Sequence, residues 1–153
     1  MSQFLRIVLI VLALAVAVLV WVELRQVEKV AEVEEVELTT HGSEKGVELV
    51  VTSPTKDSII TSPLTITGEA PGFWYFEATF PIVLVNWDGL VIAEGYATAQ
   101  GEWMTEEMVP FTATLEFETP EYGDNGALIL QKGNPSGLPE NDDAIEISIR
   151  FKD

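Results

Sequence analysis

Apolar and polar residues alternate in short runs through residues 47–152, and a period of two is typical of β-strands with one buried face. The clearest run is 111–118, where Phe111 and every second residue after it are apolar, while threonine or glutamate fills the positions between. Residues 127–131 are apolar on both faces, which predicts a central strand. Shorter alternating runs predict further strands at residues 47–52, 58–61, 64–67 and 145–151.

A central hairpin is predicted between Gly72 and Gly101. From Trp74 to Leu84 the even-numbered residues are all apolar, so this run predicts a strand with Trp74 facing the core and Tyr75 facing away. Asp88-Gly89 follows, and this dipeptide favours a two-residue type I′ turn because both turn residues need a positive φ. That loop length predicts a register in which large residues face small ones: Leu84 with Ala93, Ile82 with Gly95, and Phe80 with Ala97.

Three further expectations concern the ends of this hairpin. Pro81 has no N–H to donate to a ladder, so a bulge, a sheet edge or a strand break is expected there. Residues 68–72 are predicted to turn the chain into the hairpin. Trp87, like Tyr75, is expected to point away from the core, because both are odd-numbered.

Seven or eight short strands in about 105 residues predict an all-β fold, an antiparallel β-sandwich of immunoglobulin-like size and strand number. A domain of this length buries enough apolar surface to fold without help. The chain has no cysteine, which excludes a disulfide, a thiolate metal site, a cysteine nucleophile and a lipidated N-terminal cysteine.

The N-terminal residues predict a membrane anchor. Residues 7–22 contain no charge and no proline, and residues 4–24 as a helix would span about 31 Å, close to the thickness of a hydrocarbon core. Arg6 precedes the apolar run and Glu23 follows it, so the positive-inside rule predicts a cytoplasmic N-terminus and an extracytoplasmic C-terminal domain. The alternative is a cleaved signal peptide, because residues 13–17 fit the small-x-small cleavage pattern.

The pattern divides the chain into a single transmembrane helix at residues 1–24, an acidic stalk at 25–46 and a β-sandwich domain at 47–153. The stalk is expected to be part helix and part disordered, with a flexible joint at residues 39–43. His41 lies in that joint without a second residue at metal-ligand spacing, and it is expected to be solvated.

The formal net charge is −17, and residues 47–153 hold 18 acidic against 4 basic residues, a net charge of −14. Such a field repels phosphate backbones, so nucleic acid is excluded as a partner, and docking onto anionic lipid head groups is disfavoured. The field favours cations or basic partners.

No catalytic arrangement accompanies the acidic surface, and neither an enzyme nor a cofactor or metal protein is expected. Neighbouring carboxylates such as Glu106-Glu107 do not show the defined separation across a cleft that glycosidase chemistry needs. A P-loop and a nucleophile elbow are both lacking. Asp124-Asn125 and residues 140–143 offer oxygen ligands for calcium but do not have the EF-hand spacing, so a role in turns is preferred.

Two features are candidates for recognition. The first is a set of aromatic residues that either plug the ends of the sandwich, which is the favoured interpretation, or stack on sugar rings: Trp74, Tyr75, Trp87 and Trp103. The second is the loop at residues 134–143, interpreted as a rigid crossover or as a recognition loop. Its turn-forming residues favour a fixed conformation, beginning with Asn134, Pro135, Ser136 and Gly137.

Several motifs follow one another along the domain. They are residues 52–70, Trp74-Tyr75-Phe76-Glu77-Ala78, Glu102-Trp103-Met104, Val109-Pro110-Phe111 and residues 134–141. Together they resemble the immunoglobulin-like domain associated with bacterial spore germination, over essentially all of residues 47–152. The resemblance implies an extracytoplasmic immunoglobulin-like sandwich, usually on a lipoprotein or a membrane-anchored chain, with no catalytic activity attached to it.

The expected function is that of a membrane-anchored interaction module of the bacterial cell envelope. The N-terminal helix would lie in the lipid bilayer as a single pass, and the domain would bind an envelope protein through loops or a sheet edge. The alternative is a module that binds peptidoglycan or another glycan through exposed aromatic rings. The motif residues expected to serve recognition or structure are Trp74, Tyr75, Phe76, Glu77, Trp103, Met104, Asn134, Pro135, Ser136 and Gly137.

Overall fold

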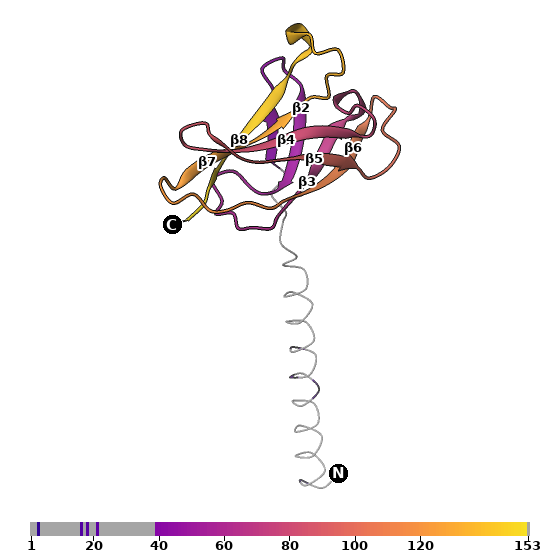
Figure 1. The fold of residues 1–153 in the computed structure, drawn as a ribbon. Coiled ribbons are helices and arrows are strands. Elements are labelled where there is room, and N and C mark those ends of the chain that lie inside the picture. The colour runs from indigo at the N-terminus through magenta and orange to yellow at the C-terminus, as the bar shows by residue number, and fades with distance from the viewer. Residues whose placement is uncertain (1–2, 4–15, 17, 19–20, 22–38, 153) are drawn as a thin grey trace. The chain divides into compact units, whose positions relative to one another are not determined.

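The computed structural model describes residues 3, 16, 18, 21 and 39–152 (Figure 1). The predicted transmembrane helix at residues 1–24 falls outside the described residues except for four positions, and the predicted stalk falls outside them up to residue 38. In the part of the chain that is described, no helix is long and apolar enough to cross a membrane.

Eight strands and two short 3-10 helices make up residues 39–152. In chain order the strands are β1 (Thr39–Gly42), β2 (Glu48–Ser53), β3 (Leu64–Pro71), β4 (Thr79–Asn86), β5 (Val91–Ala99), β6 (Met108–Leu115), β7 (Asn125–Gln131) and β8 (Ala144–Arg150). The 3-10 helices are η1 (Gly72–Trp74) and η2 (Pro139–Asn141). Neighbouring strands are antiparallel and follow the order β1-β2-β3-β6-β5-β4-β7-β8, so the all-β antiparallel fold is confirmed.

This sheet is bent into two layers at the junction of β5 and β6. The two strands pair only at Thr98 with Thr112 and at Ala99 with Phe111, whereas β3 and β6 pair along the whole of β3. One layer is therefore β1-β2-β3-β6 and the other is β5-β4-β7-β8 (Figure 1). This arrangement fits the immunoglobulin-like sandwich that the strand pattern predicts.

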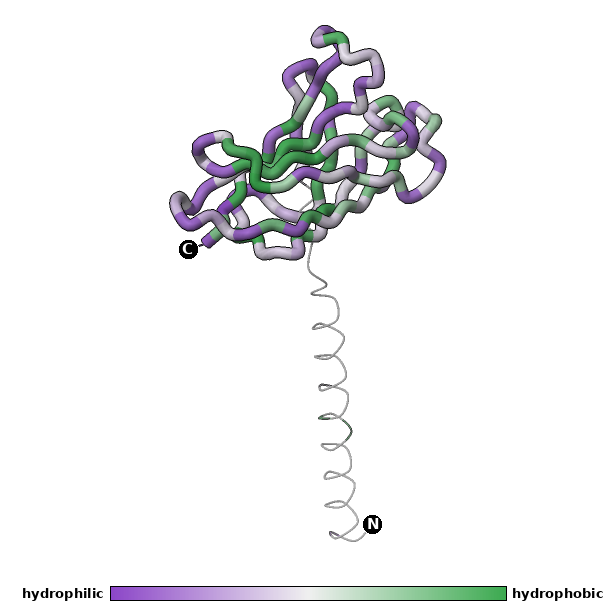
Figure 2. Tube along the Cα trace, in the orientation of Figure 1, coloured by the Kyte–Doolittle hydropathy of each residue, from purple (hydrophilic) through white to green (hydrophobic). Residues whose placement is uncertain are grey.

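Aromatic rings join the two layers in the core. Phe80 of β4 and Phe111 of β6 have ring centroids 5.0 Å apart and meet edge to face at 78°. Tyr75 also packs edge to face on Phe80, with ring centroids 5.2 Å apart and an angle of 64°. Edge-to-face pairs stabilise by about 0.5–1.5 kcal/mol beyond their burial. Figure 2 shows the hydrophobic segments running along the strands and the hydrophilic ones in the connections.

The predicted register of the central hairpin is confirmed. Phe80 faces Ala97, Ile82 faces Gly95 and Leu84 faces Ala93. The predicted turn is wrong, because the loop has three residues: Asn86 and Leu90 share a backbone hydrogen bond of 3.0 Å across it, and of its residues only Gly89 has a positive φ. A register shift after Leu84 compensates for the extra residue, so the pairs further along the hairpin are those predicted.

The predicted strand from Trp74 to Leu84 begins five residues late, at Thr79. A tight turn precedes it: the backbones of Phe76 and Thr79 bond to each other at 2.8 and 3.1 Å, and Glu77 and Ala78 both have positive φ values, 52° and 63°. The type I′ geometry expected later in the chain therefore occurs here, on residues other than glycine.

The late start of β4 reverses two predictions of exposure. Tyr75, expected to face outward, is only 4% exposed, and Phe76, expected to face the core, is 43% exposed. Strand alternation applies only inside a strand, and these residues lie before it. Trp74 is fully buried and Trp87 is exposed, as predicted.

Pro81 lies at the end of a ladder, as expected. The pairing of β4 with β7 begins at the next residue, Ile82, opposite Leu130. A residue without an N–H is tolerated at such a position. The strand predicted at 64–67 continues to Pro71, so the turn predicted at 68–72 is wrong.

Three predictions for residues 39–61 also need correction. Residues 39–43 were expected to form a flexible joint, but Thr39–Gly42 is strand β1 and pairs with β2, so His41 lies opposite Leu49. His41 is partly buried rather than solvated, and burial together with Lys56 lowers its pKa. Residues 58–61 form only a parallel bridge, in which Ile59 lies beside Arg150 of β8.

Replacing Tyr75 with phenylalanine tests how this residue stabilises the core. Its hydroxyl donates a hydrogen bond of 2.7 Å to the carbonyl oxygen of Val109, so Tyr75→Phe should lower the free energy of unfolding by about 1 kcal/mol near neutral pH. Burial raises the pKa of Tyr75 above its ordinary value, so the folded state keeps the neutral phenol while the unfolded state ionises above about pH 10. The wild-type advantage should therefore shrink as the pH rises through and beyond about 10.

Urea unfolding of the full-length chain at about pH 7 and at about pH 11 would measure both effects. Tyr122→Phe is the matched control, because Tyr122 is 79% exposed and its replacement should change stability by less than about 0.5 kcal/mol. An advantage of the wild type that stayed constant between the two pH values would contradict the assignment.

Candidate functional site

Three segments far apart in the sequence meet at one end of the sandwich: residues 72–77, 102–107 and 132–143. The contact between the first two depends on Gly72, whose N–H donates to the carbonyl oxygen of Glu107 at 3.0 Å. A Cβ atom on Gly72 would lie 2.0 Å from the carbonyl oxygen of Thr105 and 2.4 Å from that of Trp103. No side chain fits there, so the close approach of these backbones requires glycine.

The first and third segments meet in the same way at Gly133. Its N–H donates to the carbonyl oxygen of Trp74 at 2.8 Å. A Cβ atom on Gly133 would lie 2.8 Å from both the Cβ and the backbone nitrogen of Phe76. Residues 74–76 are therefore held between two neighbouring segments by backbone contacts on both sides.

The side chains of these segments divide into buried anchors and exposed apolar groups. Trp74 and Tyr75 are buried and Trp103 is partly buried, which agrees with the prediction that aromatic residues plug the ends of the sandwich. The same prediction is wrong for Trp87, which is 63% exposed. Exposed at the same end are four large apolar side chains and one carboxylate: Phe73 (54%), Phe76 (43%), Met104 (74%), Leu138 (50%) and Glu77. Phe73 and Met104 border a shallow depression of about 290 Å³ that also touches Tyr75 and Trp103.

Asn134 fixes the conformation of the loop at residues 134–143. Its amide nitrogen donates to the carbonyl oxygen of Leu138 at 2.9 Å and to Oδ1 of Asp142 at 2.6 Å. Its Oδ1 accepts the backbone N–H of Ser136 at 3.2 Å and the Ser136 hydroxyl. The Ser136 hydroxyl oxygen in turn accepts a bond of 3.0 Å from the amide of Asn141. These hydrogen bonds support the fixed conformation predicted from the sequence.

Turn geometry explains the other two residues of this motif. Gly137 has a φ of 63°, a left-handed value that favours glycine. Its N–H donates to the carbonyl oxygen of Asn134 at 3.3 Å. Pro135 lies between them, exposed, where its ring restricts the backbone.

A second set of contacts ties this loop to the N-terminal edge of the domain. Asp143 is only 8% exposed, and its Oδ2 accepts the Ser43 hydroxyl at 2.7 Å. The Ser43 hydroxyl oxygen accepts the N–H of Val47 at 3.0 Å, and Lys45 donates to the carbonyl oxygen of Glu140. Buried carboxylates need such partners, so Asp143 has a structural role.

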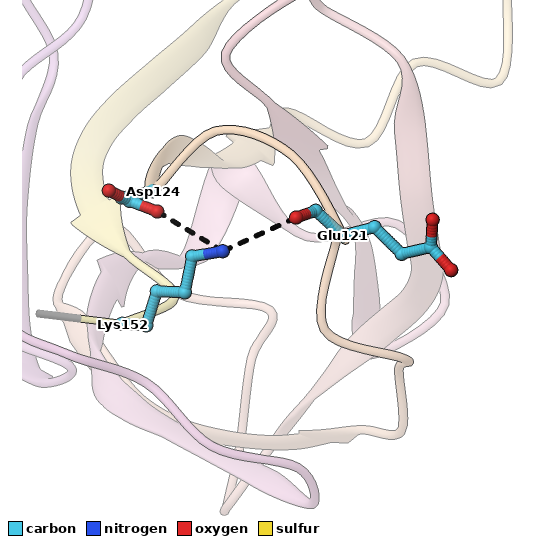
Figure 3. A network of polar contacts seen from close by, with 3 residues as sticks. All are labelled: Glu121, Asp124 and Lys152. Atoms are coloured by element: carbon cyan, nitrogen blue, oxygen red, sulfur yellow. Dashed lines mark hydrogen bonds and ion pairs between the residues drawn. The ribbon is translucent and has the colours of Figure 1, made fainter.

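The acidic residues considered as calcium ligands are engaged with protein groups. In the loop, Oδ1 of Asp142 accepts a hydrogen bond from the amide of Asn134. At the opposite end of the domain, Oδ1 of Asp124 lies 3.3 Å from Nζ of Lys152 (Figure 3). Both partners of this ion pair are about half exposed, so it adds little stability. Within residues 3–152 as far as they are described, no three His, Cys, Asp or Glu side chains are grouped so that they could hold a metal ion.

The structure brings together all ten motif residues singled out from the sequence, at one end of one domain. Sequence reasoning missed Phe73 and Leu138, which are also exposed at that end. Strand alternation could not have found either residue, because Phe73 lies in η1 and Leu138 lies directly before η2. What the arrangement offers chemically is a rigid, partly apolar surface with a carboxylate at Glu77.

Comparison with known proteins identifies one family. The family model described as the immunoglobulin-like domain of bacterial spore germination matches residues 48–137, which include β2 to β7 and the motif residues from Trp74 to Gly137. No curated protein and no solved structure matches the chain. The match covers more than half of the chain and agrees with the sandwich architecture, and the chain therefore belongs to the family of immunoglobulin-like domains of bacterial spore germination.

Proposed function

We propose that this chain is a non-catalytic interaction module of the bacterial cell envelope. The observation that carries the proposal is the rigid end of the sandwich, where three segments present Phe73, Phe76, Met104 and Leu138 to solvent. Large apolar groups held on a rigid surface are typical of the centre of protein interfaces. The proposed partner is therefore a protein of the envelope, bound through the motif residues.

The proposed position of the domain is outside the cytoplasmic membrane. The support is the charge-free apolar stretch at residues 7–22, with Arg6 before it and Glu23 after it. Membership of a spore-germination family is consistent with a role at the cell surface, and we extend the proposal to envelope assembly or germination.

The alternative function, glycan binding by stacked aromatic rings, has less support at this site. Tyr75 is only 4% exposed and its hydroxyl is bonded to Val109, so its ring is not available to a sugar. Trp103 is partly buried against the core. Stacking on a sugar needs an open ring face, which neither residue offers in full.

A reporter fusion tests the proposed location. Alkaline phosphatase joined after Asp153 should be active in intact cells, because that enzyme folds only outside the cytoplasm and the charge pattern directs the C-terminus there. The matched control lacks residues 1–24 and should be inactive. The location would be refuted if a reporter that works only in the cytoplasm were active when fused after Asp153, while the alkaline phosphatase fusion was inactive.

Photo-cross-linking tests the docking surface. Two variants, with a photoreactive phenylalanine in place of Phe76 or of Met104, should both give a discrete adduct with the same envelope protein. Thr55 is the control position, because it is exposed at the opposite end, beyond the end of β2. Phe73→Asp should reduce the yield about tenfold if Phe73 lies at the centre of the interface. An adduct of equal yield from Thr55 would contradict the assignment.

Asn134→Ala tests whether the loop is ordered in advance of binding. Loss of its four hydrogen bonds should accelerate amide hydrogen exchange across residues 136–142 by about tenfold or more, since a tenfold change corresponds to about 1.4 kcal/mol. Exchange in the core strands should not change. Glu140→Ala, in the same exposed loop, is the control and should leave exchange as in the wild type. Equal exchange in both variants would show that Asn134 does not order the loop.

A further inference from the structure

Strand β5 has an open edge along most of its length. It pairs with β6 only at Thr98 and Ala99, because the two strands then diverge into different layers. No described residue pairs with the same edge of β5 from Val91 to Ala97. An unpaired strand edge is a template for another extended chain.

The hydrogen bonds at the end of β5 show which backbone groups face this edge. The N–H of Ala99 donates to Ala78 on the β4 side at 2.8 Å, whereas the N–H of Gln100 donates to Pro110 on the β6 side at 2.7 Å. Successive residues of a strand direct their backbone groups to opposite sides. Glu94 and Tyr96 therefore direct their N–H and C=O groups toward the open edge, and both residues are exposed.

A groove lies where this edge of β5 begins. It has a volume of about 730 Å³, and its lining includes Val91 and Ile92 at the start of β5 and residues 116–121 after β6. Leu115 is buried in the core and lies against the inner face of β5, since a Cβ atom on Gly95 would lie 2.6 Å from its Cδ2. The groove itself is open to solvent, and its lining combines the apolar side chains of Val91 and Ile92 with polar ones.

The far wall of the groove is acidic. It carries Glu116, Glu118 and Glu121, and none of these carboxylates forms an ion pair with a described basic residue. Lys152 lies nearby but is used elsewhere: it pairs with Asp124 at 3.3 Å and donates to the backbone carbonyl of Glu121 at 3.4 Å. Figure 3 shows the Glu121 carboxylate turned away from Lys152.

We propose that this groove binds an extended peptide segment of a partner protein that carries lysine or arginine at alternate positions. The segment adds as an extra strand to the edge of β5, with bonds to the backbone of Glu94 and Tyr96, and its basic side chains reach the three carboxylates. A second copy of this chain is a poor occupant, because like charges would face one another in a domain of net charge −14. The groove lies at the opposite end of the strands from the motif residues, so the inference does not depend on the function proposed above.

Binding of a synthetic peptide to the full-length chain in mild detergent tests the proposal. The probe is a fluorescent seven-residue peptide that alternates lysine and valine. Fluorescence anisotropy should show binding at least about tenfold tighter than that of a peptide with glutamate in place of lysine. N-methylation of alternate peptide bonds keeps the charge but removes the donors, and it should weaken binding by about tenfold.

Two sets of variants separate the charge from the backbone edge. Glu116→Gln with Glu118→Gln should weaken binding about tenfold, whereas Glu48→Gln with Glu69→Gln, an equal charge change on the exposed faces of β2 and β3, should change it less than twofold. Glu94→Pro removes an N–H that faces the open edge of β5 and not β4, so it should abolish binding while Glu94→Ala retains it.

Several results would overturn the proposal. One is equal binding of the N-methylated peptide, which needs no variant and so does not depend on whether Glu94→Pro folds. Another is an equal loss of binding in the two pairs of glutamine variants, which would indicate attraction to net charge alone. Sedimentation that showed a dimer lost in Glu94→Pro would make a second copy the occupant of the edge.

Discussion

The domain depends on the packing of Phe80 against Phe111, because this contact joins two layers that the backbone connects only weakly. β5 and β6 share just two paired positions, and on the other side of the sandwich the segment at residues 57–60 bonds to the backbone of β8 only at Ser148 and Arg150. The ring of Tyr75 packs on Phe80, and its hydroxyl donates to the carbonyl oxygen of Val109, a residue of the β3–β6 ladder. With no cysteine in the chain, burial of apolar and aromatic surface must hold the sandwich together.

The same packing creates the exposed surface at the end of the sandwich. Drawing Trp74 and Tyr75 into the core leaves their neighbours Phe73 and Phe76 outside. The backbone contacts of Gly72 and Gly133 then prevent the segment from moving between its neighbours. The buried members of the motif thus place its exposed members, which form the surface that we propose for recognition.

At the other end of the sandwich, the divergence of the two layers leaves an open strand edge. There β5 and β6 separate, so the edge of β5 that faces away from β4 is unpaired beside Glu116 and Glu118. One end is rigid and partly apolar, and the other is open and acidic. The two surfaces therefore suit partners of different chemistry, and one domain could hold both at once.

The sequence by itself determined the strands and most of their register. Alternation predicts which residues of β2, β6 and β8 face inward, because the pleat sends successive side chains to opposite faces. Only the tertiary structure decided the conformation of residues 74–78 and the pairing of Thr39–Gly42 with β2. In both places the outcome depends on contacts with distant segments, such as Gly133 for Phe76 and Asp143 for Ser43, and local periodicity carries no information about such contacts.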